Sequence, residues 1–148
     1  MNGVRSLRMV IDGLLSNVSL VGNAVRGVLE NEPGPSQDAA LVELAVCEAV
    51  NNSIIHAYGR TDGAGANPGE VVEVIMELSE DRLTVTVADH GRLFKDFPAV
   101  LPRATEVDDL LQAPLGGWGL RILAEVMETV SYRTQGRRNE LKMSRPWR

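Results

Sequence analysis

The chain has little cysteine, no long apolar run and no excess of positive charge, and each absence narrows what it can be. Cys47 is the single cysteine, which excludes an intramolecular disulfide framework and favours a reducing, cytoplasmic compartment. No apolar run approaches the roughly 20 residues that span a bilayer. Asp12 and Gly13 interrupt residues 1–15 before the apolar segment of a signal peptide can form. The net charge of −5 argues against nucleic acid or an anionic membrane as the main partner.

What the chain does contain is the composition of one globular domain. Of its 148 residues, 44% are hydrophobic and 24% are charged, which is a soluble profile with enough apolar side chains for a single core. No internal repeat or low-complexity tract divides it. We therefore expect one domain over residues 1–148.

Hydrophobic periodicity and turn residues predict about five strands and three helices. The predicted strands are Arg8–Ile11, Val71–Leu78, Arg82–Ala88, Val130–Thr134 and Asn139–Met143. The predicted helices begin after a cap at Ser16 or Asn17, begin after a cap at Ser36, and cover Gly119–Glu128. This order favours a two-layer α/β sandwich, with a mixed sheet and the helices on one face. The long stretch from Asp89 to Pro114 has no strong pattern, which is typical of a functional lid.

One predicted helix carries polar residues in an otherwise apolar sequence. The segment Ala39–Ala57 has no proline or glycine, and Glu48, Asn52 and His56 lie four residues apart along it. That spacing places the three side chains on one stripe of the helix. Desolvating an unpaired carboxylate is costly, so the stripe must face water, a metal, a ligand or a cationic side chain.

The chemistry of this stripe allows more than one interpretation. An amide oxygen from Asn52 suits Mg²⁺, which takes oxygen ligands and keeps waters and substrate phosphates in its shell. The carboxylate of Glu48 could accept a proton from an attacking hydroxyl. The same carboxylate is equally consistent with an ion pair to an arginine of the sheet. His56 could approach phosphates or interact with the C-terminal dipole of the helix.

Asp89 ends a predicted strand and is followed by Gly91. An ionised carboxylate only accepts hydrogen bonds, so Asp89 matches an exocyclic amino group such as that of adenine. Gly91 would let the backbone pass close to a flat ring. An ordinary turn after a strand explains this pair of residues as well.

Three glycines precede the last predicted helix, in the segment Gly116-Gly117-Trp118-Gly119. Closely spaced glycines leave backbone N–H groups accessible, and a helix N-terminus attracts phosphate oxygens. No Lys-Ser or Lys-Thr pair follows, so the segment is not a P-loop, and the six-residue dinucleotide fingerprint is also absent. A flexible entry into a helix remains the alternative.

In their order, these elements resemble the ATP-binding domain shared by gyrase, heat-shock chaperones, histidine kinases and DNA-repair ATPases, the GHKL or Bergerat fold. The chain is most similar to the stand-alone anti-sigma-factor serine kinases of bacteria. Its matching segments are Glu48-Ala49-Val50-x-Asn52-x-x-x-His56-Ala57-Tyr58 for the first box, Asp89-x-Gly91 with Leu93-Phe94-x-Asp96 for the second, and Gly117-x-Gly119-Leu120 for the third. The resemblance covers nearly the whole chain, and the first box is its most specific part.

The resemblance implies a role for each matched residue. Glu48 would be the general base, Asn52 the Mg²⁺ ligand and Asp89 the adenine anchor. The remaining residues of the implied ATP site are Gly91, Gly117, Gly119, Leu120 and His56.

The function implied by the resemblance is a cytoplasmic serine protein kinase that also acts as an anti-sigma factor. It would use Mg-ATP to phosphorylate a serine of a small anti-anti-sigma (STAS-domain) protein, sequester a sigma factor in another nucleotide state, and form a homodimer. A nucleotide-dependent binding switch without phosphoryl transfer is the alternative. A histidine-kinase catalytic domain is disfavoured, because the chain has no extra helical hairpin carrying a phospho-accepting histidine.

Overall fold

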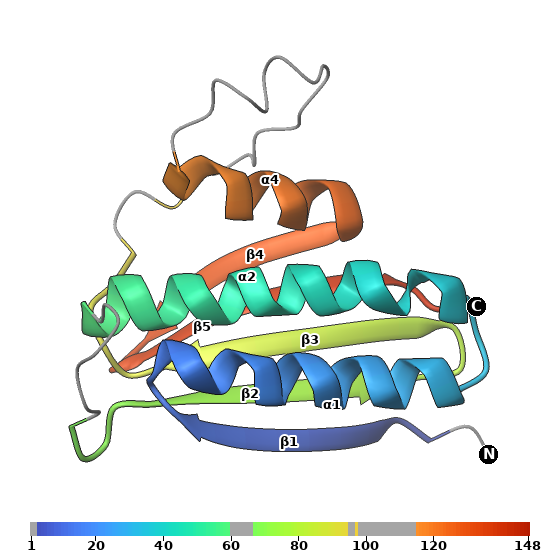
Figure 1. Cartoon of the computed structure of the whole chain (residues 1–148), viewed down its shortest axis with the longest axis horizontal. Coiled ribbons are helices and arrows are strands. Elements are labelled where there is room, and N and C mark those ends of the chain that lie inside the picture. The colour runs from blue at the N-terminus through green and yellow to red at the C-terminus, as the bar shows by residue number, and fades with distance from the viewer. Residues whose placement is uncertain (1–2, 60–66, 95–96, 98–114) are drawn as a thin grey trace.

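The computed structural model describes residues 3–59, 67–94, 97 and 115–148, with only the backbone for 115–119. Residues 95–96 and 98–114, which make up most of the predicted lid and include Asp96 of the second box, lie outside the described residues. The two termini lie at the end of the molecule where α2 begins (Figure 1).

A five-stranded sheet forms one layer of the molecule. Its strands are β1 (Arg5–Asp12), β2 (Val71–Leu78), β3 (Arg82–Asp89), β4 (Thr129–Gln135) and β5 (Arg138–Pro146), in the order β1-β2-β3-β5-β4. The prediction of five strands in a two-layer α/β sandwich is confirmed. All four neighbouring pairs are antiparallel, so the described sheet is antiparallel where the sequence indicated a mixed one.

Three helices cover one face of this sheet (Figure 1). They are α1 (Val18–Asn31), α2 (Ala39–Tyr58) and α4 (Leu115–Val126). Asn17 is the N-cap residue of α1, one of the two positions predicted, although its side chain makes no capping hydrogen bond. The cap predicted at Ser36 is wrong, because Ser36 begins a short 3₁₀ turn, Ser36–Asp38, and Asp38 is the residue before α2. None of the helices in the described part of the chain is long and apolar enough to cross a membrane.

The end of α2 is fixed by a glycine. Gly59 has φ 62°, in the left-handed region, and its N–H donates to the carbonyl of Ile55 at 3.0 Å. A glycine adopts this conformation without the steric cost of a Cβ, so it is the common residue just after a helix. The chain therefore turns out of α2 at a defined point, next to the end of β3.

The core lies between the helices and the sheet. In β3, every second side chain (Leu83, Val85 and Val87) is buried toward the helices, as the alternation in the sequence predicts. From the helix layer, fully buried side chains meet them: Val25, Leu29, Val42, Val46, Val50, Ile54 and Leu123. Burial of these side chains holds α2 at the middle of the helix layer, with α1 and α4 on either side.

The face of the sheet away from the helices carries ion pairs across its strands. Glu73 of β2 accepts hydrogen bonds from Arg8 of β1 and, at 2.8 Å, from Arg138 of β5. Glu73 is only 9% exposed, although its neighbours Val72 and Val74 point to the opposite face and into the core. The two guanidinium groups satisfy this carboxylate, which would otherwise be costly to bury.

Packing of α1 on the core predicts a large effect of truncating Leu29. Leu29 is 0% exposed, whereas Leu20 on the same helix is 60% exposed. Leu29→Ala should lower the free energy of unfolding by about 2–5 kcal/mol, because it leaves a cavity. The matched variant Leu20→Ala should change it by no more than about 0.5 kcal/mol. Urea denaturation of both variants measures the free energy of unfolding. Equal losses of that free energy in the two variants would contradict the burial of Leu29 in the core.

Candidate functional site

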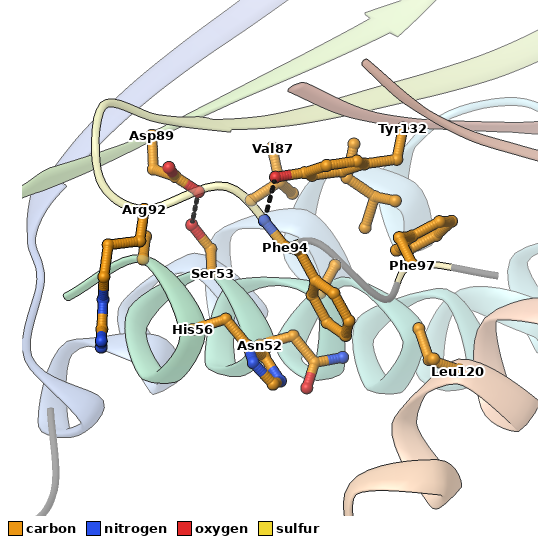
Figure 2. A pocket seen from close by; sticks show the side chains of 13 residues that line it. Asn52, Ser53, His56, Val87, Asp89, Arg92, Phe94, Phe97, Leu120 and Tyr132 are labelled. Atoms are coloured by element: carbon orange, nitrogen blue, oxygen red, sulfur yellow. Dashed lines mark hydrogen bonds between the residues drawn. The ribbon is translucent and has the colours of Figure 1, made fainter. Parts of the chain in front are cut away.

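A cavity opens between α2, the turn after β3, the hairpin β4–β5 and α4. Figure 2 shows it from close by. Its lining residues are Ala49, Asn52, Ser53, His56, Ala57, Val87, Asp89, Arg92, Phe94, Phe97, Leu120, Tyr132 and Leu141. Its volume is ≈ 30 Å³, which has room for water but not for a purine ring.

The predicted stripe on α2 runs along this cavity. Asn52 and His56 line it, and Glu48 lies one helical turn before Asn52. None of the three side chains is buried in the core. Among the described residues, neither Glu48 nor Asn52 has a hydrogen-bond or ion-pair partner, so the predicted alternative of an arginine from the sheet is absent there. Both groups are therefore available to a ligand.

The environment of Glu48 is partly desolvated. Burial raises the pKa of the Glu48 carboxyl above its ordinary value. Desolvation disfavours the ionised form, which makes the carboxylate a stronger proton acceptor once it has lost its proton. Glu48 does not itself line the cavity, although Ala49 and Asn52 beside it on the helix do. It lies at the rim.

His56 lies near the end of α2, against an aromatic ring. Its ring centroid is 4.0 Å from that of Phe94. Burial lowers the pKa of His56, and the positive charge of Arg92 lowers it further. The neutral imidazole is thus favoured, packed beside the cavity at the helix end.

Asp89 is the buried acidic group of the site. It is 6% exposed, and three donors surround its carboxylate. The hydroxyl of Ser53 donates at 2.6 Å, the N–H of Gly91 at 3.1 Å and the amide of Asn139 at 2.8 Å. Figure 2 shows Ser53 of α2 pointing up to this carboxylate. These bonds compensate the burial of the charge and fix its direction.

Gly91 is required for the approach of the turn to α2. A Cβ at Gly91 would lie 2.6 Å from the carbonyl carbon of Ala57, closer than real contacts allow. The next residue, Arg92, donates its N–H to the carbonyl oxygen of Ala57 at 2.9 Å. The sequence attributed this glycine to the approach of a flat ring, but in the structure the close neighbour is the backbone of α2.

A cluster of three aromatic side chains, Phe94, Phe97 and Tyr132, lines one side of the cavity. The rings of Phe97 and Tyr132 stack with centroids 5.0 Å apart, and Phe94 meets both edge-on. The N–H of Phe94 donates to the hydroxyl of Tyr132 at 2.9 Å, drawn as a dashed line in Figure 2. Any ligand base that reaches Asp89 must move these rings, because the remaining volume is too small.

The glycine segment lies within α4 and does not precede it. The sequence predicted that the helix begins at Gly119, but α4 begins at Leu115, so Gly117 and Gly119 are in its first turns. Leu120 is 8% exposed and lines the cavity. The first turn of α4 still provides backbone N–H groups without helical partners, which is the feature that suits phosphate.

Comparison with known proteins identifies the family. The model of the histidine kinase-like ATPase domain matches residues 11–145. The chain belongs to this family. The resemblance found in the sequence is thereby confirmed, and the three boxes all fall within the matched range.

Similar curated proteins include the serine-protein kinase RsbW of Staphylococcus aureus, strains JH9 and Newman. Each is 26% identical over 136 residues, which cover 88% of this chain and 80% of the relative. Two solved structures share the fold. One holds the RsbU and RsbW domains of Rv1364c from Mycobacterium tuberculosis, with a TM-score of 0.61, 19% identity and coverage of 97% of this chain and 33% of that one. The other is the SiaB–SiaC complex from Pseudomonas aeruginosa, with a TM-score of 0.63, 18% identity and coverage of 95% and 89%.

Several residues of the site were not identified from the sequence. Ser53 follows Asn52 directly, but a serine inside a helix gives no signal of its own. Asn139 faces Asp89 only because β3 and β5 pair in that register, and Tyr132 enters from β4 by the pairing of the hairpin. Knowledge of the strand order, which periodicity does not provide, would have been needed to find them.

The residues present fit a magnesium ion. A divalent cation that keeps waters and phosphates in its shell needs only one or two oxygen ligands from the protein. Asn52 offers an amide oxygen without a partner among the described residues, and it lines the cavity. No group of three acidic, histidine or cysteine side chains suited to a metal is found in that part of the chain, so an all-protein metal cage is not formed there.

The contact between Gly91 and α2 predicts a specific steric effect. Gly91→Ala should destabilise the protein by about 1–3 kcal/mol, because the added methyl group overlaps the backbone of Ala57. Gly27→Ala is the matched control, since nothing lies within 4 Å of a Cβ there and alanine favours the helix. Thermal and urea unfolding measure both. A neutral Gly91→Ala variant would contradict the close approach.

Proposed function

We propose that this chain is an ATP-dependent serine protein kinase that acts as an anti-sigma factor in a partner-switching pathway. The observation that carries the proposal is the arrangement around α2. The carboxylate of Glu48 and the amide of Asn52, neither of which has a partner in the part of the chain that the structure describes, lie one turn apart. They lie beside a cavity that is also lined by the buried carboxylate of Asp89. Membership of an ATPase family and similarity to proteins named serine-protein kinase support it.

The proposed binding mode places each end of ATP on a different element. Asp89 would accept a hydrogen bond from the 6-amino group of adenine. The triphosphate would extend past Asn52 toward the first turn of α4, where Gly117 and Gly119 leave the backbone open. Asn52 would hold Mg²⁺, which supplies neutralisation of the phosphate charge when it is bound.

In the proposed reaction, Glu48 is the general base. A serine hydroxyl of the partner protein attacks the γ-phosphorus, and the bond from that phosphorus to the β-bridging oxygen breaks, releasing ADP. Glu48 accepts the proton of the attacking hydroxyl. Its position one helical turn from Asn52, outside the residues that line the cavity and incompletely buried, leaves it accessible to a protein substrate.

The aromatic cluster could couple nucleotide binding to partner binding. Phe94 and Phe97 occupy the space that adenine would need, so binding would move them and the chain on which they lie. A ligand that favours one arrangement shifts the population toward it. We propose that this shift selects between a STAS-domain anti-anti-sigma protein and a sigma factor, in a cytoplasmic homodimer.

Glu48→Gln tests the catalytic part of the proposal. The variant should lose phosphoryl transfer by about 100-fold or more, the scale of a general base, while ATP affinity changes by no more than a few-fold. Transfer of labelled phosphate from ATP to purified STAS-domain proteins of the same organism measures the first, and calorimetric titration the second. Glu43→Gln is the control, because Glu43 lies on the same helix but pairs with Arg26 at 3.3 Å.

The pH dependence provides a second measurement on the same pair of proteins. Because burial raises the pKa of Glu48, the parent protein should lose its rate on acidification at a higher pH than an exposed carboxylate would require. The base is active only when ionised, so the rate falls as pH drops through that pKa. Unchanged turnover in Glu48→Gln would remove Glu48 from catalysis. Nucleotide binding without any transfer in the parent would identify a binding switch instead.

A further inference from the structure

The side chain of Asn139 makes two hydrogen bonds to the turn that follows β3. It lies on β5 directly opposite Asp89 on β3, and it is 2% exposed. Its amide nitrogen donates to the Asp89 carboxylate at 2.8 Å and to the carbonyl of Gly91 at 3.0 Å. One side chain thus binds both ends of the turn from Asp89 to Gly91.

A second residue completes the hydrogen bonds of the Asn139 amide. The hydroxyl of Thr134, the neighbour of Asn139 across the β4–β5 pair, donates to the amide oxygen of Asn139 at 2.9 Å. An amide has one accepting oxygen and one donating NH₂ group. The Asp89 carboxylate and the Gly91 carbonyl only accept, so the NH₂ group faces them and the amide oxygen is left for the Thr134 hydroxyl. A series of hydrogen bonds therefore runs from Thr134 on β4 through Asn139 on β5 to Asp89 at the end of β3.

Counting acceptor positions shows what is left for a ligand. Each oxygen of an ionised carboxylate has two lone-pair directions. On Asp89, Oδ1 accepts from both Gly91 and Asn139, and Oδ2 accepts from Ser53. One acceptor position of Oδ2 remains. Because Oδ1 is held by two donors from the turn and from β5, the carboxylate cannot rotate to present another edge.

We propose that Asn139 is a positioning residue that selects the base of the nucleotide. By holding the Asp89 carboxylate in one orientation, it leaves a single acceptor position, which pairs with an exocyclic amino group and repels a carbonyl oxygen. The inference rests on the proposed function, because it assumes that a purine triphosphate binds beside Asp89. It adds that base discrimination depends on a residue from the last strand, which need not touch the nucleotide.

The test compares ATP with inosine triphosphate, which carries a carbonyl in place of the 6-amino group. The two share the same triphosphate and ribose, so contacts to those parts cancel in the ratio of their dissociation constants. The parent protein should prefer ATP. Asn139→Ala should reduce that preference by about tenfold, the scale of a hydrogen bond to a charged group, because the Asp89 carboxylate can then turn. Asn139→Thr, which keeps a donor, should recover part of it.

Lys142→Ala is the matched control, because Lys142 is exposed on the same strand. It should leave the ratio unchanged. If Asn139→Ala does not fold, Thr134→Val is the second variant. It removes the hydroxyl that anchors the Asn139 amide oxygen, and should lower the preference several-fold, because the amide then holds Asp89 less firmly.

The outcomes separate the inference from the proposed function. A parent protein that binds neither nucleotide overturns both. A parent that prefers ATP, with equal weakening of both nucleotides in Asn139→Ala and Thr134→Val, overturns the inference alone, because a merely structural residue lowers both affinities together. A selective loss of the ATP preference, recovered in Asn139→Thr, supports it.

Discussion

The buried carboxylate of Asp89 is the constraint on which the arrangement of the site depends. A charge that is 6% exposed is tolerated only with donors around it, and the three donors come from α2, from the turn after β3 and from β5. Ser53, Gly91 and Asn139 therefore hold the helix layer, the turn and the sheet to one point. The polar bonds define the end of the cavity, while the apolar core between the two layers supplies most of the stability.

The second constraint is the shortage of space beside that carboxylate. The aromatic rings of Phe94, Phe97 and Tyr132 reduce the cavity to ≈ 30 Å³. A preformed pocket for a purine would be far larger. Binding must therefore be coupled to rearrangement of rings that belong to the segment after β3. The protein is proposed to bind different partners in different nucleotide states. Movement of these rings on nucleotide binding would change the surface that those partners meet.

Much of the fold could be predicted from the sequence, because the physical signals were local. Alternation in Arg82–Ala88 and the apolar segment Ala39–Ala57 are strong patterns, and the observed elements extend each by one residue. The strand Val71–Leu78 is predicted with its observed bounds. The start of α4 was predicted wrongly, since glycines weaken a helical pattern, yet the helix begins at Leu115. The antiparallel order of the sheet depends on contacts between distant segments, which periodicity does not contain.

For the site, the sequence identified polar groups at positions where apolar residues are expected, such as a carboxylate and an amide on an apolar helix. It could not identify Asn139 or Tyr132, because their importance arises from pairing with residues far away in the chain. One cavity brings the predicted residues together: it is lined by Asn52, His56 and Asp89, and Glu48 lies one helical turn from Asn52. Their catalytic and binding roles remain proposals.

A crystal structure of the protein with magnesium and a non-hydrolysable ATP analogue tests the central claim most directly. We expect the 6-amino group of adenine within hydrogen-bond distance of Asp89 Oδ2, the phosphates beside Asn52 and the start of α4, and the Phe94 ring displaced from its contact with His56. A nucleotide bound elsewhere on the molecule, with Asp89 still enclosed by the aromatic rings, would contradict it.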